Sequence, residues 1–212
     1  MKVVILCGGK GVRYSSDKPK ALAMIGNKPI IHHLIDFYVQ QGFNEFILCL
    51  GWKPEHIINY FDTGANNFKI DFVNTGEESH TAKRLKLIES YIPKEDKNFL
   101  CNYCDGLANV DLIALQARHL TNKNIATLTT VHLINQFGIL ELDYSGNVIK
   151  FIEKPKMIEF INGGFFIFDK KIFGDININK NQELEKDILV TLANDEQLGS
   201  YYHDDFWETL NT

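Results

Sequence analysis

The 212-residue sequence predicts an α/β fold of the Rossmann-like kind, a mostly parallel mixed sheet with helices on both faces. Two observations carry this prediction. Apolar runs alternate with amphipathic stretches from the first residues onward, which is the pattern of βα units wound around a parallel sheet. The first run, residues 2–7, is apolar at nearly every position, as a strand covered on both faces requires.

The first part of the chain is expected to supply the parallel strands and most of the helices. Helical spacing of apolar residues, such as Ile30, Leu34 and Tyr38, marks the amphipathic stretches. Strands are expected over residues 2–7, 45–50, 69–73, 99–103 and 125–132, and helices over residues 29–41, 54–61, 81–91 and 110–119.

The pattern changes beyond about residue 136. Short strands are expected over residues 138–143, 148–152, 164–168 and 200–203, with one further helix over residues 183–193. No repeat, low-complexity tract or linker interrupts the chain. We therefore expect a single domain over residues 1–212, with a first half to about residue 135 and a second half from about residue 136.

The composition limits the classes of partner. The net charge is −5 and basic residues form no run, which argues against nucleic acid. No apolar stretch approaches the roughly 20 residues of a membrane span, and the N-terminus has no signal-peptide pattern. The sequence therefore predicts a cytoplasmic protein without a membrane partner. The CxxC spacing of Cys101 and Cys104 lacks a second ligand pair, so we expect structural thiols there.

A glycine-rich turn closes the first strand: Leu6-Cys7-Gly8-Gly9-Lys10-Gly11-Val12-Arg13, followed by Lys18-Pro19-Lys20. Glycines let backbone N–H groups approach phosphates closely, and Arg13 and Lys20 add the positive charge that such a group needs. The run matches neither a Walker A loop nor the dinucleotide fingerprint, whose third glycine would fall at Arg13. It predicts a nucleoside triphosphate site, with a plain surface turn as the alternative.

Asp105 follows the strand expected over residues 99–103, within Cys104-Asp105-Gly106. Ligands of open α/β sheets bind beyond the carboxyl ends of the strands, where the glycine-rich turn also lies. A carboxylate there can hold Mg²⁺ against phosphate oxygens. The alternative is a cap for the helix expected over residues 110–119, but Asn109 suits that role better.

With these residues in place, the chain resembles the sugar-1-phosphate nucleotidyltransferases, and among them most closely the glucose-1-phosphate cytidylyltransferases. The turn stands where the family has Gly-Gly-x-Gly-Thr-Arg, with Val12 in place of threonine. The segment that points to cytosine is Thr75-Gly76-Glu77-Glu78-Ser79-His80-Thr81-Ala82-Lys83-Arg84-Leu85-Lys86. Further matches are Phe137-Gly138, Glu153-Lys154-Pro155 and Ile161-Asn162-Gly163-Gly164-Phe165-Phe166.

The resemblance implies a nucleotide-diphospho-sugar transferase fold and transfer of CMP from CTP to a phosphorylated small-molecule acceptor. The first half would bind the nucleotide, with residues 6–13, Ser79, Arg84 and Cys104 around it. Lys20 would bridge the reacting phosphates, and Asp105 would bind Mg²⁺. Glu153, Lys154, Asn162 and Gly163, in the second half, would face the acceptor. Self-association of the chain stays open.

Two departures from the family pattern leave the acceptor open. Asn211 stands where a second metal-binding aspartate is expected, and the segment between Tyr60 and Thr75 is short. A sugar 1-phosphate for surface polysaccharide synthesis is the first expectation. Phosphocholine or phosphoglutamine is the alternative acceptor, and a nucleotide-binding protein without turnover is a third reading.

Overall fold

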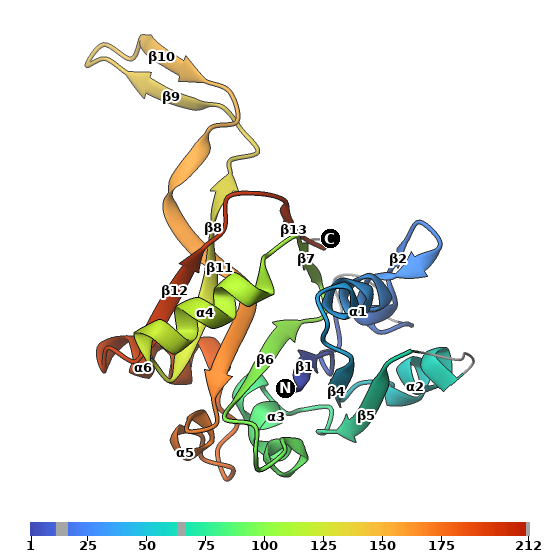
Figure 1. The fold of residues 1–212 in the computed structure, drawn as a ribbon. Coiled ribbons are helices and arrows are strands. Elements are labelled where there is room, and N and C mark those ends of the chain that lie inside the picture. Colours follow the sequence, from blue (N-terminus) through green and yellow to red (C-terminus); the bar gives the residue numbers. More distant parts are fainter. Residues whose placement is uncertain (12–16, 63–66, 211–212) are drawn as a thin grey trace.

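A seven-stranded sheet forms the centre of the molecule in this computed structural model, which describes residues 1–11, 17–62 and 67–210 (Figure 1). The strand order is β12-β8-β11-β6-β1-β4-β5. Their bounds are β1 Val3–Leu6, β4 Glu45–Leu50, β5 Lys69–Asn74, β6 Asn98–Tyr103, β8 Ala126–Ile134, β11 Lys156–Asp169 and β12 Leu198–Tyr202. Only β11 runs antiparallel to its neighbours in this sheet. The predicted fold class, a mostly parallel mixed sheet, is confirmed.

Helices cover both faces of the sheet and enclose two apolar cores. One face carries α1 Ile30–Gln40, α2 Pro54–Asp62 and α4 Leu112–Asn122, and the other carries α3 Thr81–Leu87, α5 Ile172–Asp175 and α6 Val190–Asn194. Alternate residues of one strand therefore serve different cores: Val4 and Leu6 pack toward α3, and Val3 and Ile5 pack toward α1. No helix among the described residues is long and apolar enough to cross a bilayer.

Several expected elements have different bounds in the structure. The helix expected over residues 81–91 ends at Leu87 and continues as a 3-10 turn, Glu89–Tyr91. The helix expected over residues 183–193 is a π-helix, Leu184–Leu189, that leads into α6. Asp111 caps α4 by accepting from the N–H of Ala114 at 2.8 Å, so the expected cap at Asn109 was wrong.

Four short strands had no clear pattern in the sequence: β2 Met24–Ile25, β3 Lys28–Pro29, β7 Gly106–Ala108 and β13 Trp207–Thr209. The β7–β13 ladder brings the last described residues next to Asp105, where the N–H of Leu210 donates to the Asp105 carbonyl at 2.8 Å. The indole N–H of Trp207 donates to the Gly163 carbonyl at 2.7 Å. The C-terminal segment thus joins the carboxyl edge of the sheet.

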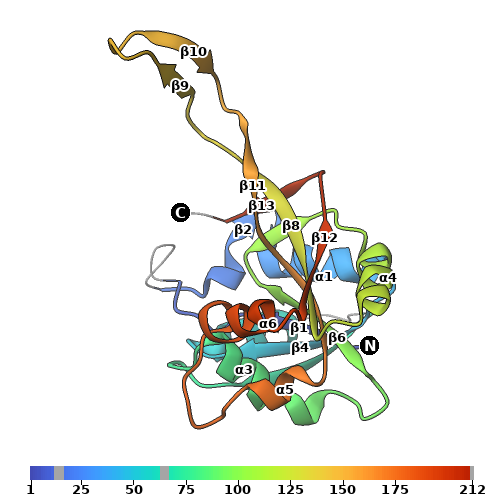
Figure 2. The ribbon, with the colours of Figure 1, turned by 90° about the vertical axis from the view of Figure 1, so that its left-hand side faces the viewer.

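A two-stranded arm rises from the body (Figures 1 and 2). Strands β9 Ile139–Leu142 and β10 Val148–Ile152 pair only with each other among the described strands. Between them, the Asp143 carboxylate accepts from the N–H groups of Ser145 and Asn147, both at 2.8 Å, and so closes the turn. The long strands β8 and β11 form the stem that carries the arm.

Candidate active site

A cavity of about 420 Å³ opens at the carboxyl ends of β1 and β6. Of the sequence-predicted residues, the structure brings together Leu6, Cys7, Gly8, Gly9, Gly11, Lys20, Ser79, Arg84, Cys104 and Asp105 along its walls. Its size lies within the about 300–1,000 Å³ of small-molecule sites. We call it the first cavity.

Arg84, on α3, ties the turn after β1 to the segment after β5. Its guanidinium donates to the carbonyls of Gly8 at 3.0 Å, Gly76 at 2.8 Å and Glu77 at 3.1 Å. It also bonds the Leu50 carbonyl at 3.2 Å and the Thr75 hydroxyl at 2.6 Å. The side chain is only 4 % exposed. Arg84 therefore sits in the floor of the first cavity, with its N–H groups largely engaged by the backbone.

The charge of Arg84 is not neutralised by its partners. All five acceptors are uncharged, and no carboxylate pairs with Arg84 among the residues that the structure describes. Burial lowers its pKa, although a guanidinium keeps its proton throughout the physiological range. A cation fixed at the floor of a cavity raises the local concentration of anionic ligands.

Two glycines make room for this guanidinium. A Cβ atom at Gly8 would lie 2.0 Å from Arg84 Nη1, and one at Gly51 would lie 2.6 Å from it. At Gly51 the added atom would also lie 2.4 Å from the carbonyl oxygen of Gly8. Gly51, directly after β4, thus packs against Arg84 of the cavity, although the sequence analysis did not select it.

Lys20 and Asp105 form an ion pair at the mouth of the first cavity. Lys20 Nζ lies 2.7 Å from Asp105 Oδ2, and the side chains are 19 % and 30 % exposed. Lys20 belongs to a short 3-10 helix, Lys20–Leu22, and Asp105 follows β6. The pair thus presents an ammonium group and a carboxylate side by side to a ligand in the cavity.

The cysteines near the site are neutral thiols. Burial raises the pKa of Cys104, and the neighbouring carboxylate of Asp105 raises it further. Burial also raises the pKa of Cys7 well above the usual value of a thiol. Protonated thiols neither ligate a soft metal nor act as nucleophiles. Asp105 is therefore the group of this wall that suits a hard cation.

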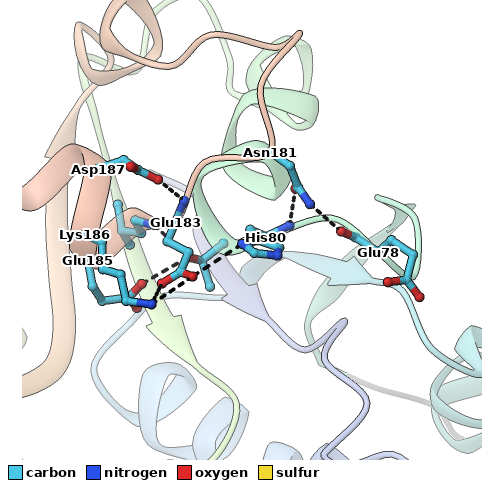
Figure 3. A network of polar contacts seen from close by, with 9 residues as sticks. Glu78, His80, Asn181, Glu183, Glu185, Lys186 and Asp187 are labelled. Atoms are coloured by element: carbon cyan, nitrogen blue, oxygen red, sulfur yellow. Dashed lines mark hydrogen bonds and ion pairs between the residues drawn. The ribbon is translucent and has the colours of Figure 1, made fainter.

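The opposite wall comes from His80 and Thr81, which belong to the segment that points to cytosine, and from Tyr103, Glu183 and Glu185, which sequence reasoning missed. Figure 3 shows the segment around residues 181–187 lying against His80. The Asn181 side chain accepts from the His80 N–H at 2.7 Å and donates to the Glu78 carbonyl at 2.8 Å. Glu185 accepts from the hydroxyls of Tyr103 and Thr81. In the sequence, the only sign of Glu183 and Glu185 was that two carboxylates stand two residues apart before an apolar stretch.

A second cavity, of about 760 Å³, lies beside the β7–β13 ladder at the base of the arm. Lys154 lines it, together with Lys156, Asp204, Trp207 and Glu208. Of the other residues expected to face the acceptor, Gly163 is held by Trp207, and Asn162 accepts from the Gly164 N–H at 2.9 Å. Glu153 lies near Gly138 and Phe151, where the arm meets its stem.

Three expected site residues, Val12, Arg13 and Asn211, lie outside the described residues. Lys10 extends from the turn toward the opposite wall and pairs with Glu78 at 2.7 Å and Glu77 at 3.0 Å. No cluster of three or more His, Cys, Asp or Glu groups suited to a metal occurs within residues 1–11, 17–62 and 67–210. A metal bound at Asp105 would thus need ligands from elsewhere, such as substrate oxygens.

The chain is similar to known proteins over its whole length. It is 40% identical to a probable glucose-1-phosphate cytidylyltransferase of Bacillus subtilis, with 100% of this chain and 92% of the relative aligned. It is 34% identical to the glucose-1-phosphate cytidylyltransferase of Salmonella typhi, covering 100% of this chain and 91% of that one. The first alignment spans 236 positions, so the relative carries residues without a counterpart here.

Solved structures share the fold of this chain. HddC from Yersinia pseudotuberculosis, complexed with GMP-PN, superposes with a TM-score of 0.74 and is 26% identical over 98% of this chain and 92% of that chain. The sequence profile of the nucleotidyl transferase family matches residues 2–210. The chain therefore belongs to the nucleotidyl transferase family.

Proposed function

We propose that this chain is a CTP-dependent cytidylyltransferase that transfers CMP to a sugar 1-phosphate, such as glucose 1-phosphate, and releases pyrophosphate. The observation that carries the proposal is the Lys20–Asp105 pair in the wall of the first cavity, at the carboxyl ends of β1 and β6. The choice of CTP and of the acceptor is supported by the printed activity of relatives 34–40% identical over the full chain.

In the proposed reaction, an oxygen of the acceptor phosphate forms a bond to the α-phosphorus of CTP while the bond from that phosphorus to the pyrophosphate oxygen breaks. The attacking phosphate is already an anion, so no general base is needed. The barrier is repulsion between anions, and the chain lowers it by positioning and charge. The turn at residues 8–11 offers N–H groups to the triphosphate, Arg84 attracts it, and Lys20 lies between the two reacting phosphates.

Enzymes of this family generally use a divalent metal ion, and we propose Mg²⁺ bound at Asp105. The described residues fit this ion: the Asp105 carboxylate, 30% exposed, lines the cavity, and Mg²⁺ takes one or two carboxylates together with substrate phosphates. Bound Mg²⁺ would polarise the phosphoryl oxygens, an effect of several kcal/mol. Asp105 would hold the ion, and the Leu210–Asp105 backbone bond places the chain just before Asn211 next to it.

For the acceptor we propose the region between the two cavities, with Lys154 toward the acceptor phosphate and Asn162 and Gly163 beside its other groups. Glu153, at the foot of the arm, would complete this side. We also propose a division into a nucleotide-binding half to about residue 135 and an acceptor-binding half from about residue 136, with Glu183 and Glu185 of the second half reaching the first cavity. We also propose a cytoplasmic location, since all four cysteines are free thiols, as is usual in a reducing compartment.

The test is pyrophosphate release from CTP and Mg²⁺ with glucose 1-phosphate, phosphocholine, phosphoglutamine or no acceptor. Release with glucose 1-phosphate supports the proposal. Release only with a non-sugar phosphate would leave the transfer of CMP in place and overturn the acceptor. If CTP bound without any release over an extended panel of phosphorylated acceptors, the chain would be a nucleotide-binding protein. Lys20→Ala should remove most turnover, and Lys28→Ala, whose lysine pairs with Asp36 on α1, should not.

A further inference from the structure

The loop directly after β4 contacts two segments that build the first cavity. The N–H of Trp52 donates to the Gly8 carbonyl at 3.1 Å. The ammonium group of Lys53 donates to the Asp17 carbonyl at 2.8 Å and to the Asp17 carboxylate at 3.2 Å. Asp17 stands three residues before Lys20 in the sequence. One loop therefore holds both the start of the glycine-rich turn and the segment that carries Lys20.

The backbone conformation of Lys53 is unusual. Its φ of 46° lies in the left-handed region, which glycine adopts without strain and a lysine rarely adopts. The next residue is Pro54, and a residue before proline prefers an extended conformation. Strained residues of this kind persist where surrounding contacts hold them, and they occur most often at functional sites. A lysine at a position that suits glycine points to a role for its side chain.

The bond from Lys53 to the Asp17 carbonyl fixes the main chain. The ammonium group also holds the pKa of the Asp17 carboxyl below its usual value, but the Asp17 side chain is 84% exposed. An exposed ion pair contributes little to stability. A bond to a carbonyl instead determines where the backbone lies, and Pro19, with its fixed φ, stiffens the short path from Asp17 to Lys20. We therefore expect this contact to affect position more than stability.

Lys20 depends on the placement of this backbone at two contacts. Its Nζ lies 2.7 Å from Asp105 Oδ2. Its Cβ packs against the glycine-rich turn, where a Cβ atom added at Gly11 would lie only 2.8 Å away. A shift of the main chain at residues 17–20 would therefore move Lys20 relative to both Asp105 and the turn.

We propose that Lys53 is a positioning residue for the transfer reaction, whose ammonium group holds the main chain at Asp17 and thereby places Lys20 between the reacting phosphates. This inference rests on the proposed function. Lys53 is not among the described residues that line the first cavity, so it acts through Lys20. Because Lys20 acts on the phosphates as they react, its displacement should lower kcat more than it raises the KM for CTP.

Lys53→Gly is the first variant, since it removes the ammonium group and suits the left-handed backbone without strain. With glucose 1-phosphate as acceptor, we expect kcat for pyrophosphate release to fall about 10-fold and the KM for CTP to change less than about 3-fold. The midpoint of thermal unfolding should not fall. Lys53→Arg should keep kcat within about 3-fold, because a guanidinium can also donate to the carbonyl and the carboxylate of Asp17.

Lys123→Gly is the matched control. Lys123 also has a positive φ, 59°, but it ends α4 just before β8, at the opposite edge of the sheet from the first cavity. Lys123→Gly should leave kcat unchanged. Unchanged kcat in Lys53→Gly would overturn the proposal, and so would an equal loss in Lys53→Arg. A lower unfolding midpoint in Lys53→Gly but not in Lys123→Gly would also overturn it, because Lys53 would then support the fold.

A double variant tests whether Lys53 acts through Lys20. In a Lys20→Ala background, the residual turnover is measured with radiolabelled CTP and enzyme in excess. Lys53→Gly should lower this residual rate by less than about 2-fold, because the side chain that it positions is already gone. A loss in this background as large as in the unmodified chain would show that the two lysines act independently, and would contradict the proposal.

Amide hydrogen exchange separates this proposal from the proposed function. If the unmodified chain released no pyrophosphate from CTP with any acceptor, the proposed function would fail, but the placement of residues 17–20 could still be measured. The N–H groups of Leu22 and Ala23 bond the carbonyls of Pro19 and Lys20, both at 2.9 Å. These amides should exchange at least about 5-fold faster in Lys53→Gly than in Lys123→Gly. Equal exchange would overturn the positioning role of Lys53 whether or not the chain transfers CMP.

Discussion

The two cavities at the carboxyl edge of the sheet hold their charged groups in different ways. In the first cavity Arg84 is 4 % exposed and makes five hydrogen bonds, and the side chains of the Lys20–Asp105 pair are 19% and 30% exposed. In the second cavity Lys156 and Asp204 form a pair whose side chains are 48% and 52% exposed. Interactions between charges strengthen as water is excluded, so equal substitutions should have unequal effects on the two sides. The first cavity is built before any ligand arrives, whereas the second keeps its charges in solvent.

The largest difference in turnover is expected between the variants of two aspartates, Asp105 and Asp204. Asp105→Asn removes the carboxylate proposed to hold Mg²⁺ and leaves the charge of Lys20 unpaired, so turnover should fall at least about 100-fold. Asp204→Asn alters an exposed pair and should cost less than about 10-fold. Pyrophosphate release under saturating CTP and acceptor measures both variants. Equal losses would show that the two cavities do not differ in this respect, and unchanged turnover in Asp105→Asn would contradict the metal assignment.

Arg84→Lys tests whether the hydrogen bonds of Arg84 stabilise the walls of the first cavity. A lysine keeps the charge but reaches fewer of the five acceptors, so buried acceptors of Gly8, Leu50 and Thr75 lose their donors. We expect a loss of about 3 kcal/mol in the free energy of unfolding by urea, together with a higher KM for CTP. Lys83→Ala, on the same helix, is the control and should change the stability by less than about 0.5 kcal/mol. A stable Arg84→Lys with a normal KM would show that the five bonds do not position the turn.

The first cavity was also the part of the site that the sequence predicted best, and the reason is local. The turn after β1 and the segment 103–106 each follow a strongly apolar strand, and strand ends in a parallel sheet share one edge. Residues 6–11 and Asp105 could therefore be placed together from pattern alone. Lys20 lay close enough in sequence to the turn to be included.

What the sequence did not predict depends on distant contacts. Gly51 has an ordinary position after a strand, and its role appears only when Arg84, from α3, fills the space beside it. Glu185 reaches the first cavity through a π-helix that an apolar pattern reads as a regular helix. The front half of β11 was missed because residues 156–162 are mostly exposed and a register shift follows Asn162, so the alternation expected of a half-buried strand is broken there.

Gly51→Ala tests, with a single added methyl group, how tightly the residues around Arg84 are packed in the first cavity. The added methyl group would meet the Gly8 carbonyl and the Arg84 guanidinium, both of which are held by hydrogen bonds and cannot move cheaply. We expect a loss of about 1–3 kcal/mol in the free energy of unfolding. Gly9→Ala is the matched control for stability, because a Cβ atom there meets nothing within 4 Å. Equal stability of the two variants would show that the packing around Arg84 is looser than the contacts imply.

The smallest expected effect is a loss of stability at acid pH in β8, the strand that leads to the second cavity. His119, at the end of α4, is 3 % exposed, and its ring lies 2.9 Å from the Thr127 hydroxyl on β8. Burial lowers the pKa of His119 below its usual value of about 6.5. Below that pH the unfolded chain binds a proton that the folded chain does not, so this contribution to stability is complete above about pH 6.5 and is lost as the pH falls toward the folded pKa.

His119→Gln keeps a hydrogen-bonding group beside Thr127 but does not titrate, so its free energy of unfolding should depend less on pH between about 7.5 and 5.5. Part of the dependence should remain, because burial also lowers the pKa of His32. In the unmodified chain, amide exchange at acid pH should increase in β8 before it increases in β1, since β8 is the strand that contacts His119. Equal protection of both strands would show that acid destabilises the sheet as one unit and that the two sides differ only in their ligand-facing charges.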